Sequence, residues 1–198
     1  MPSTRNRTSR RWRIAAALLV APLFAVVGMV APAHAVSTWH IHVSYAGDGM
    51  CLDAADAPGD PNQDPTKDGD KVQMWHCNGA INQAWTFHLT QSDPPQFYIT
   101  NDASGLCLDM NIANSNSSWT NFDSRTVQLW HCNQWSNQIW AQEVAANGDA
   151  LLQSLRDPGG TDNFMDAKNF GGWNPGKDGD QILVWSYNDG STQRWYWN

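Results

Sequence analysis

Past its first 35 residues, the sequence has few basic residues and hardly any glutamate. Five of its 12 Lys and Arg side chains lie in that first stretch, whereas all 19 acidic residues follow it. Residues 36–198 therefore carry seven basic and 19 acidic side chains, a formal charge of −12. Nucleic-acid binding needs stripes of Lys or Arg that neutralise phosphates. The charge thus argues against nucleic acids, and also against anionic membrane surfaces, as partners.

Common catalytic motifs are missing as well. The sequence contains no Gly-x-Ser-x-Gly, no His-Glu-x-x-His and no phosphate-binding loop motif. Its only glutamate is Glu143. The many aspartates recur in a pattern that can be explained without a pair of catalytic carboxylates. We therefore predict that the protein is not an enzyme, and we expect no cofactor.

The first 35 residues are typical of a secretory signal. Five arginines between Arg5 and Arg13 precede an apolar run over residues 14–30, and Ala33-His34-Ala35 provides an A-x-A cleavage site. The alternative is a membrane anchor, but 17 apolar residues that include Pro22 are short for a span. We predict a signal peptide over 1–35 and a secreted, extracellular domain over 36–198, with no membrane insertion after cleavage.

A Gln-x-Trp triplet recurs at a fixed interval. Its tryptophans are Trp85, Trp140 and Trp195, each 55 residues after the one before. Upstream, residues 72–78 and 127–133 share the pattern Val-Gln-x-Trp-His-Cys-Asn, and residues 182–188 are a looser copy. A fixed period of this kind indicates a repeat architecture. We place the three repeats at about 38–90, 91–145 and 146–198.

Beyond the signal, no long stretch has helical periodicity. Short apolar or alternating runs are separated by dense Gly, Pro, Asn and Asp, which is typical of strands joined by turns. We predict an all-β chain with about four short strands per repeat and one core shared by all three repeats. A strand would also point the Gln and the Trp of each triplet inward together. The clearest expected strands span 39–43, 71–75, 96–100, 126–130, 151–155 and 181–185.

Four cysteines allow three pairings. Cys51 and Cys77 lie in repeat one, and Cys107 and Cys132 lie at the matching places of repeat two. We predict disulfides Cys51–Cys77 and Cys107–Cys132, each stabilising the fold by roughly 3 kcal/mol through loop-closure entropy. At the matching places of repeat three we expect an aromatic contact between Phe164 and Tyr187. Zinc is the alternative, but these spacings are not those of CxxC ligand pairs.

Two other patterns raise the question of a metal. Lys67-Asp68-Gly69-Asp70 and Lys177-Asp178-Gly179-Asp180 resemble fragments of a calcium loop, although the closing Glu is missing and Asp-Gly before a strand is more simply a turn. His40 and His42 would share one strand face, without a third ligand nearby, so we expect them at a surface or an edge. We predict no metal site.

The triplets, with Cys-Leu-Asp before them and Val-Gln-x-Trp-x-Cys between, resemble the ricin B-type lectin domain. The resemblance covers about residues 38–198 and implies a β-trefoil: three repeats around a pseudo-threefold axis. It also implies a stand-alone, secreted lectin that binds a glycan or polysaccharide, galactose-like or xylan-type, without catalysis. We expect a monomer.

The resemblance also implies the site residues. A sugar needs a carboxylate and amides for its hydroxyls and a flat aromatic for its C–H face. The Asp would be the main hydroxyl acceptor, the Trp the stacking platform and the Asn a hydroxyl partner, with the triplet Gln supporting the Asp. Repeat one offers Asp53, Gln73, Trp75, Asn82 and Gln83. Repeat two offers Asp109, Gln128, Trp130, Asn137 and Gln138.

Repeat three departs from this pattern. It keeps Asp166, Trp185 and Gln193, but Leu183 and Thr192 stand where the other repeats have Gln and Asn. Because two polar contacts are lost, we expect weak or no binding there. In all three repeats the alternative is structural: the aspartates would form turns and the tryptophans would pack in the core.

Long polar inserts at 58–70, 111–125 and 169–180 should lie beside the sites. Trp119 and Trp173 lie in these inserts, and Trp135 lies just before Gln138. Exposed, they would add stacking platforms; buried, they would only hold a loop in place. The inserts also support an alternative function, a protein-binding trefoil such as a protease inhibitor acting through one long loop. A purely structural envelope protein is a third reading.

Overall fold

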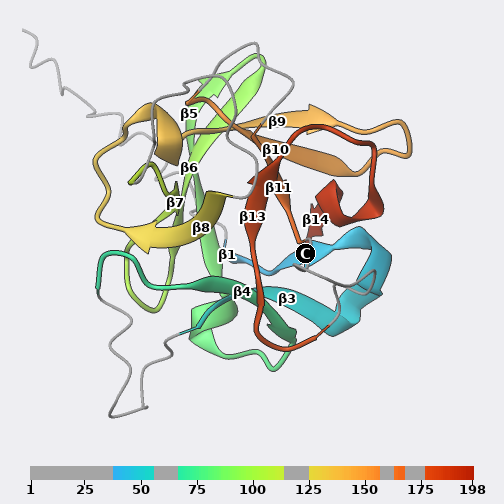
Figure 1. Cartoon of the computed structure of the whole chain (residues 1–198), viewed down its shortest axis with the longest axis horizontal. Helices are drawn as coiled ribbons and strands as arrows, with labels where there is room; N and C mark the ends of the chain where they lie inside the picture. Colours follow the sequence, from blue (N-terminus) through green and yellow to red (C-terminus); the bar gives the residue numbers. More distant parts are fainter. Residues whose placement is uncertain (1–37, 56–66, 114–124, 157–162, 168–176) are drawn as a thin grey trace, which may run out of the picture. The chain divides into compact units, whose positions relative to one another are not determined.

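We describe the computed structural model of the protein over residues 38–55, 67–113, 125–156, 163–167 and 177–198 (Figure 1). In these ranges the chain forms β-strands and short 3-10 turns, so the predicted all-β class is confirmed. The described residues include no helix with the length and hydropathy of a membrane span. The inserts, with Trp119 and Trp173, and the predicted signal peptide lie largely or wholly outside these ranges.

The strands follow the three sequence repeats. Repeat one and its link to repeat two contain β1 (Thr38–Trp39), β2 (Ile41–Val43), η1 (Ser44–Gly49), β3 (Met50–Ala54), β4 (Val72–His76), η2 (Ile81–Gln83) and β5 (Trp85–Ser92). Repeat two contains β6 (Pro95–Asn101), β7 (Cys107–Met110), β8 (Arg125–Trp130), η3 (Ser136–Gln138) and β9 (Trp140–Val144). Repeat three contains β10 (Ala150–Ser154), β11 (Phe164–Asp166), β12 (Asp180–Gln181), β13 (Leu183–Trp185), η4 (Ser191–Gln193) and β14 (Trp195–Trp197).

The predicted strands match the observed ones closely. All six expected runs differ from an observed strand or strand pair by one residue at most at each end, and two of them, 71–75 and 151–155, are β4 and β10 shifted by one residue. Two of the runs are interrupted: His40 separates β1 from β2, and Ile182 separates β12 from β13. Each repeat contains one antiparallel pair with the same register, Asp53 opposite Gln73 in β3–β4, Asp109 opposite Gln128 in β7–β8, and Asp166 opposite Leu183 in β11–β13.

The repeats meet at their central strands, and β4, β8 and β13 converge near the middle of Figure 1. Ile182 links all three, since its amide donates to the Val72 carbonyl (3.1 Å) and its carbonyl accepts from the Val127 amide (2.9 Å). The Gln181 side chain donates to the carbonyls of Val72 and Val127, both at 3.0 Å. The ends of the domain are joined as well, because β14 pairs with β2. One apolar core therefore draws on all three repeats, as predicted.

The triplet tryptophans are the largest side chains in that core. Trp85, Trp140 and Trp195 are fully buried. Each indole N–H donates to a carbonyl of its own repeat, those of Leu52 (2.9 Å), Leu108 (3.0 Å) and Met165 (3.0 Å). Burying a tryptophan removes a large apolar area from water, and its polar N–H needs a partner once buried. The same solution is repeated three times.

The triplet glutamines are also fully buried, but our strand prediction for them was wrong. Gln83, Gln138 and Gln193 end the 3-10 turns η2, η3 and η4, and the strands begin only at the tryptophans. Each Gln crosses its loop: its Nε2 donates to the carbonyl of His76, His131 or Ser186 at 2.9–3.0 Å, and its Oε1 accepts an amide N–H five residues upstream. A turn therefore orients these side chains inward, rather than the period of a strand.

Both predicted disulfides are present, Cys51–Cys77 and Cys107–Cys132, each with its Cα atoms 5.1 Å apart. The expected aromatic replacement is also confirmed, because the rings of Phe164 and Tyr187 lie 5.4 Å apart.

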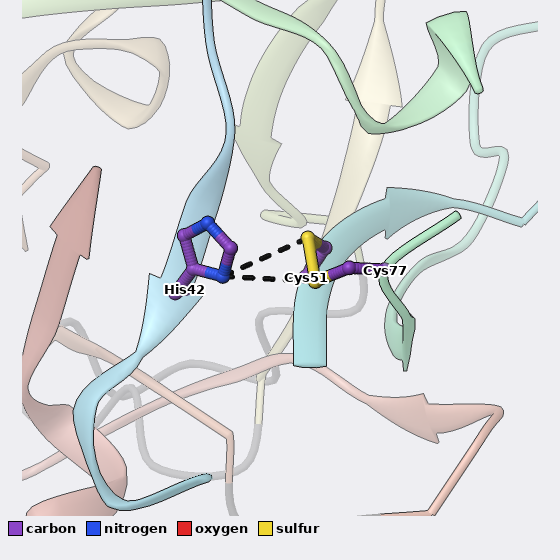
Figure 2. A group of neighbouring side chains, drawn as sticks. All are labelled: His42, Cys51 and Cys77. Carbon is purple, nitrogen blue, oxygen red and sulfur yellow. Dashed lines mark hydrogen bonds between the residues drawn. A yellow bond between two sulfur atoms is a disulfide. The ribbon is translucent and has the colours of Figure 1, made fainter. Parts of the chain in front are cut away.

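His42 does not lie at the surface, contrary to our expectation. It is 4% exposed, stacks on Tyr196 at 4.9 Å, and its Nε2 lies 3.1 Å from Asn198 Oδ1. Figure 2 shows its Nδ1 facing the disulfide, 3.7 Å from Cys51 Sγ and 3.6 Å from Cys77 Sγ. These three residues could be grouped as metal ligands, but the two sulfurs are bonded to each other and so are not thiolates.

Candidate functional site

The candidate sugar sites are built on the β3–β4 and β7–β8 pairs. Because Asp and Gln lie directly opposite each other in these pairs, their side chains share one face. The 3-10 turns η2 and η3 then bring the Asn and Gln of the triplet region to the same carboxylate. Residues far apart in the sequence thus gather around a single Asp in each repeat.

In repeat one, Asp53 accepts three amide hydrogen bonds. Gln73 donates to Oδ1 at 3.0 Å, and Asn82 and Gln83 donate to Oδ2 at 2.8 and 3.0 Å. The Asn82 amide also donates to the Ala54 carbonyl at 2.9 Å. All four side chains are buried. Four of the five candidate residues of repeat one, all except Trp75, therefore form one hydrogen-bonded cluster.

Repeat two contains the same cluster around Asp109. Gln128 donates to Oδ1 at 3.0 Å, and Asn137 and Gln138 donate to Oδ2 at 2.6 and 3.1 Å. Asn137 also donates to the Met110 carbonyl at 3.2 Å. The duplication of these contacts shows that they follow from the repeated sequence rather than from one local accident.

The atoms of these clusters that can still form hydrogen bonds are acceptors. A carboxylate has about four lone-pair positions, and three N–H groups use three of them in each repeat. Both amide hydrogens of Asn82 and Asn137 are committed, whereas the Oδ1 atoms of these two residues are buried without a hydrogen-bond partner. Buried polar atoms normally have a partner. A hydroxyl group that reaches one of these clusters would therefore meet acceptors rather than donors.

Burial changes the acidity of both carboxyl groups. It raises the pKa of Asp53, an effect opposed by the bonds from Gln73, Gln83 and Asn82. In repeat two burial raises the pKa of Asp109 to about 6, against the lowering effect of Gln128 and Gln138. The neighbouring carboxylates Asp178 and Asp68 raise these two values further. Repeat two therefore has a carboxyl group that changes charge in mildly acidic solution.

The two sites differ in their aromatic residues. Trp75 is 37% exposed and Trp130 is half-buried. In repeat two, a pocket of about 120 Å³ is lined by Asp109, Gln128 and Asn137 together with Trp130, Trp135 and Ile112. Trp135 is 61% exposed, so it is not buried to hold a loop in place, and its use as a stacking platform stays a prediction. Ala80 and Gly190 occupy the matching positions of the other repeats.

Repeat three differs as its sequence indicates. Asp166, Leu183 and Gln193 are fully buried, and Trp185 is half-buried. Leu183 lies opposite Asp166, at the position that Gln73 and Gln128 occupy in the other repeats. An aliphatic side chain cannot donate to a carboxylate, so the complete amide cluster is not formed here.

The calcium-like fragments have a different environment. Asp68 Oδ1 accepts from the His131 amide at 2.5 Å, and Oδ2 lies 2.7 Å from His131 Nδ1. Asp178 Oδ1 lies 2.7 Å from both the amide nitrogen and Nδ1 of His76. Each contact crosses from one repeat to another. We did not anticipate these contacts, because the only sequence signal was the shared Lys-Asp-Gly-Asp motif.

Comparison with known proteins agrees with this architecture. The family described as "Ricin-type beta-trefoil lectin domain-like" matches residues 30–122 and 81–185, together most of the chain. The chain therefore belongs to the ricin-type β-trefoil lectin family. A search of curated proteins found no match.

Solved structures show the same fold. The designed threefold-symmetric protein ThreeFoil is 21% identical, with a TM-score of 0.61 over 81% of this chain and 96% of its own. The Macrolepiota procera ricin B-like lectin, solved in complex with lactose, is 16% identical, with a TM-score of 0.57 over 82% and 94%. An exo-β-1,3-galactanase from Clostridium thermocellum is 22% identical, with a TM-score of 0.59 over 81% of this chain and 30% of the enzyme. The predicted β-trefoil fold is thereby confirmed.

Proposed function

We propose that this protein is a secreted, non-catalytic lectin that binds galactose-like or xylan-type glycans through repeats one and two. The observation that carries the proposal is the duplicated cluster in which three amides orient one buried Asp beside a tryptophan. Such an arrangement offers hydroxyl acceptors and an apolar platform together, the two features that a sugar ring requires.

In this account each residue has a role. Asp53 and Asp109 accept a sugar hydroxyl, and Asn82 and Asn137 are further hydroxyl partners. The glutamines hold the carboxylate in place and are not the main contacts of the sugar. They are Gln73 and Gln83 in repeat one and Gln128 and Gln138 in repeat two. Trp75 and Trp130 stack on the C–H face of the ring. Repeat three, which has Leu183 in place of a glutamine, binds weakly or not at all.

Repeat two is the stronger site in this proposal. Its pocket has aromatic walls from both Trp130 and Trp135, whereas Ala80 takes the place of Trp135 in repeat one. A second platform suits a disaccharide or a longer chain, because the neighbouring sugar unit can stack on it. Two sites on one monomer would raise avidity for a polymer by about 10²–10⁴ if both engage together.

A glycan array tests this proposal. We expect the secreted, oxidised protein to bind a restricted set of galactose- or xylose-containing glycans, with longer chains preferred over monosaccharides. The same protein, reduced and unfolded, is the control. Failure of the folded protein to bind any glycan would contradict the proposal and direct attention to the inserts as a protein-binding surface, the alternative function.

A further inference from the structure

The strands that carry the candidate tryptophans each lie against a turn from another repeat. The turn at residues 67–71 of repeat one pairs with β8 of repeat two: the Gly69 amide donates to the Leu129 carbonyl, and the Leu129 amide donates to the Asp70 carbonyl, both at 2.8 Å. In repeat three, β12 pairs with β4 of repeat one, and the Gly179 amide donates to the Met74 carbonyl at 2.9 Å. Each strand that carries a site tryptophan therefore lies between the Asp-bearing strand of its own repeat and a turn from another repeat.

The first aspartate of each of these turns contacts the residue that follows the site tryptophan. Asp68 binds the amide and Nδ1 of His131, next to Trp130, and Asp178 binds the amide and Nδ1 of His76, next to Trp75. We call each of these contacts an Asp–His clasp. The Trp130 and His131 rings are themselves only 5.8 Å apart. His131 therefore lies next to Trp130 both along the chain and through its ring.

The turns are shaped for this contact. Gly69 and Gly179 have φ values of +95° and +89°, in the region that side chains rarely adopt. The second aspartate of each turn, Asp70 or Asp180, accepts the backbone amide of Lys67 or Lys177 at 3.1 Å, which closes the turn on itself. The first aspartate of each turn, Asp68 or Asp178, reaches a neighbouring repeat.

The clasps are too exposed to be important for folding. The His side chains are 61% and 71% exposed and their Asp partners 36% and 35%, and even a full ion pair in such surroundings stabilises a fold only slightly. A binding site is more demanding than a fold, because its side chains must be held within about 0.5 Å of their working positions. The contact is therefore better placed to orient a tryptophan than to stabilise the domain.

We propose that the two sugar sites are completed across repeat boundaries: Asp68 of repeat one is a positioning residue for the site of repeat two, and Asp178 of repeat three is a positioning residue for the site of repeat one. The inference deepens the proposed lectin function and rests on it. It also makes the turns at residues 67–71 and 177–181 part of sites to which the repeat pattern alone does not assign them.

Reciprocal substitutions test the proposal. We call the sites of repeats one and two site one and site two. In a chain with only site two intact (Asp53→Asn), Asp68→Ala should weaken binding of the sugar found on the glycan array by about three- to tenfold. This is the loss expected for one exposed charge-assisted contact. In a chain with only site one intact (Asp109→Asn), Asp68→Ala should change nothing, and Asp178→Ala should cause the loss instead. Each variant is thus the other's control.

A conservative variant separates positioning from loss of charge. Asp68→Asn keeps an oxygen for the His131 amide and can donate its own N–H to Nδ1, so it should restore most of the affinity that Asp68→Ala loses. Equal losses at both sites, or no loss at either, would overturn the proposal.

The indole N–H signals of the tryptophans in an NMR spectrum give a readout that needs no sugar. Asp68→Ala should shift the Trp130 signal and leave that of Trp75 in place, and Asp178→Ala should do the reverse. An unchanged Trp130 signal would overturn the clasp whether or not the protein binds glycans. Absence of glycan binding with the expected indole shifts would instead count against the lectin function alone.

Discussion

The rings of Phe164 and Tyr187 lie 5.4 Å apart at the place where repeats one and two have disulfides. Phe164 is buried beside Ala145 and Leu151, whereas Tyr187 is 45% exposed. An apolar contact thus replaces a covalent one at the same point of the repeat, and the surrounding backbone keeps its pairing, with Phe164 opposite Trp185 as Cys51 is opposite Trp75.

This equivalence predicts that a third disulfide can be built. The double variant Phe164→Cys/Tyr187→Cys should form a bridge that closes a loop of similar length to the native ones, worth roughly 3 kcal/mol. The matched control is Phe164→Ser/Tyr187→Ser, which removes the same rings without a bridge. Urea unfolding under oxidising conditions should show the cysteine pair to be more stable by about that amount. Equal stability of the two variants would mean that repeat three has lost the geometry of its relatives.

The raised pKa of Asp109 predicts a pH dependence at site two. Protonation removes the charged hydroxyl acceptor, so affinity at this site should fall as the pH decreases through about 6. Sugar titrations between pH 8 and about 5 on an Asp53→Asn chain would measure it. An affinity that stays constant over this range would contradict the role given to the carboxylate.

The carboxyl group of Asp109 should also affect the free energy of unfolding, but with the opposite dependence on pH. The pKa of Asp109 is higher in the folded state than its ordinary value of 3.8, so the folded state holds the proton more tightly than the unfolded one. Its contribution to the free energy of unfolding therefore decreases as the pH rises from about 4 to about 6. Asp109→Asn should remove this part of the pH dependence, which unfolding curves of the two proteins would reveal by difference.

Trp135 should distinguish the two sites. Trp135→Ala is expected to weaken binding of an oligosaccharide at site two by about three- to tenfold, because an aromatic contact contributes about 0.5–1.5 kcal/mol beyond its buried area. Trp135→Phe should retain most of the affinity, and a monosaccharide should be affected less than a chain. A loss that is the same for both ligands would indicate a general disturbance of the pocket rather than a second platform.

Features that recur at matching positions of the repeats could be predicted from the sequence. The disulfide of Cys107 and Cys132 and the burial of Trp140 both follow from matching positions in neighbouring repeats. The contact between Asp68 and His131 could not be predicted in this way, because it depends on how one repeat is placed against another. The orientation of Gln138 was predicted for the wrong reason, since a 3-10 turn and not a strand directs it inward.

Substitution at the two central aspartates tests the account most directly. Asp53→Asn and Asp109→Asn keep the shape of the side chain, and Gln73 or Gln128 can turn its amide to accept from the new N–H group, so the fold should survive. We predict that each single variant binds the array-selected glycan at one site fewer and that the double variant binds none, with an unchanged circular dichroism spectrum. Full binding by a folded double variant would contradict the account and would move sugar recognition away from both amide clusters.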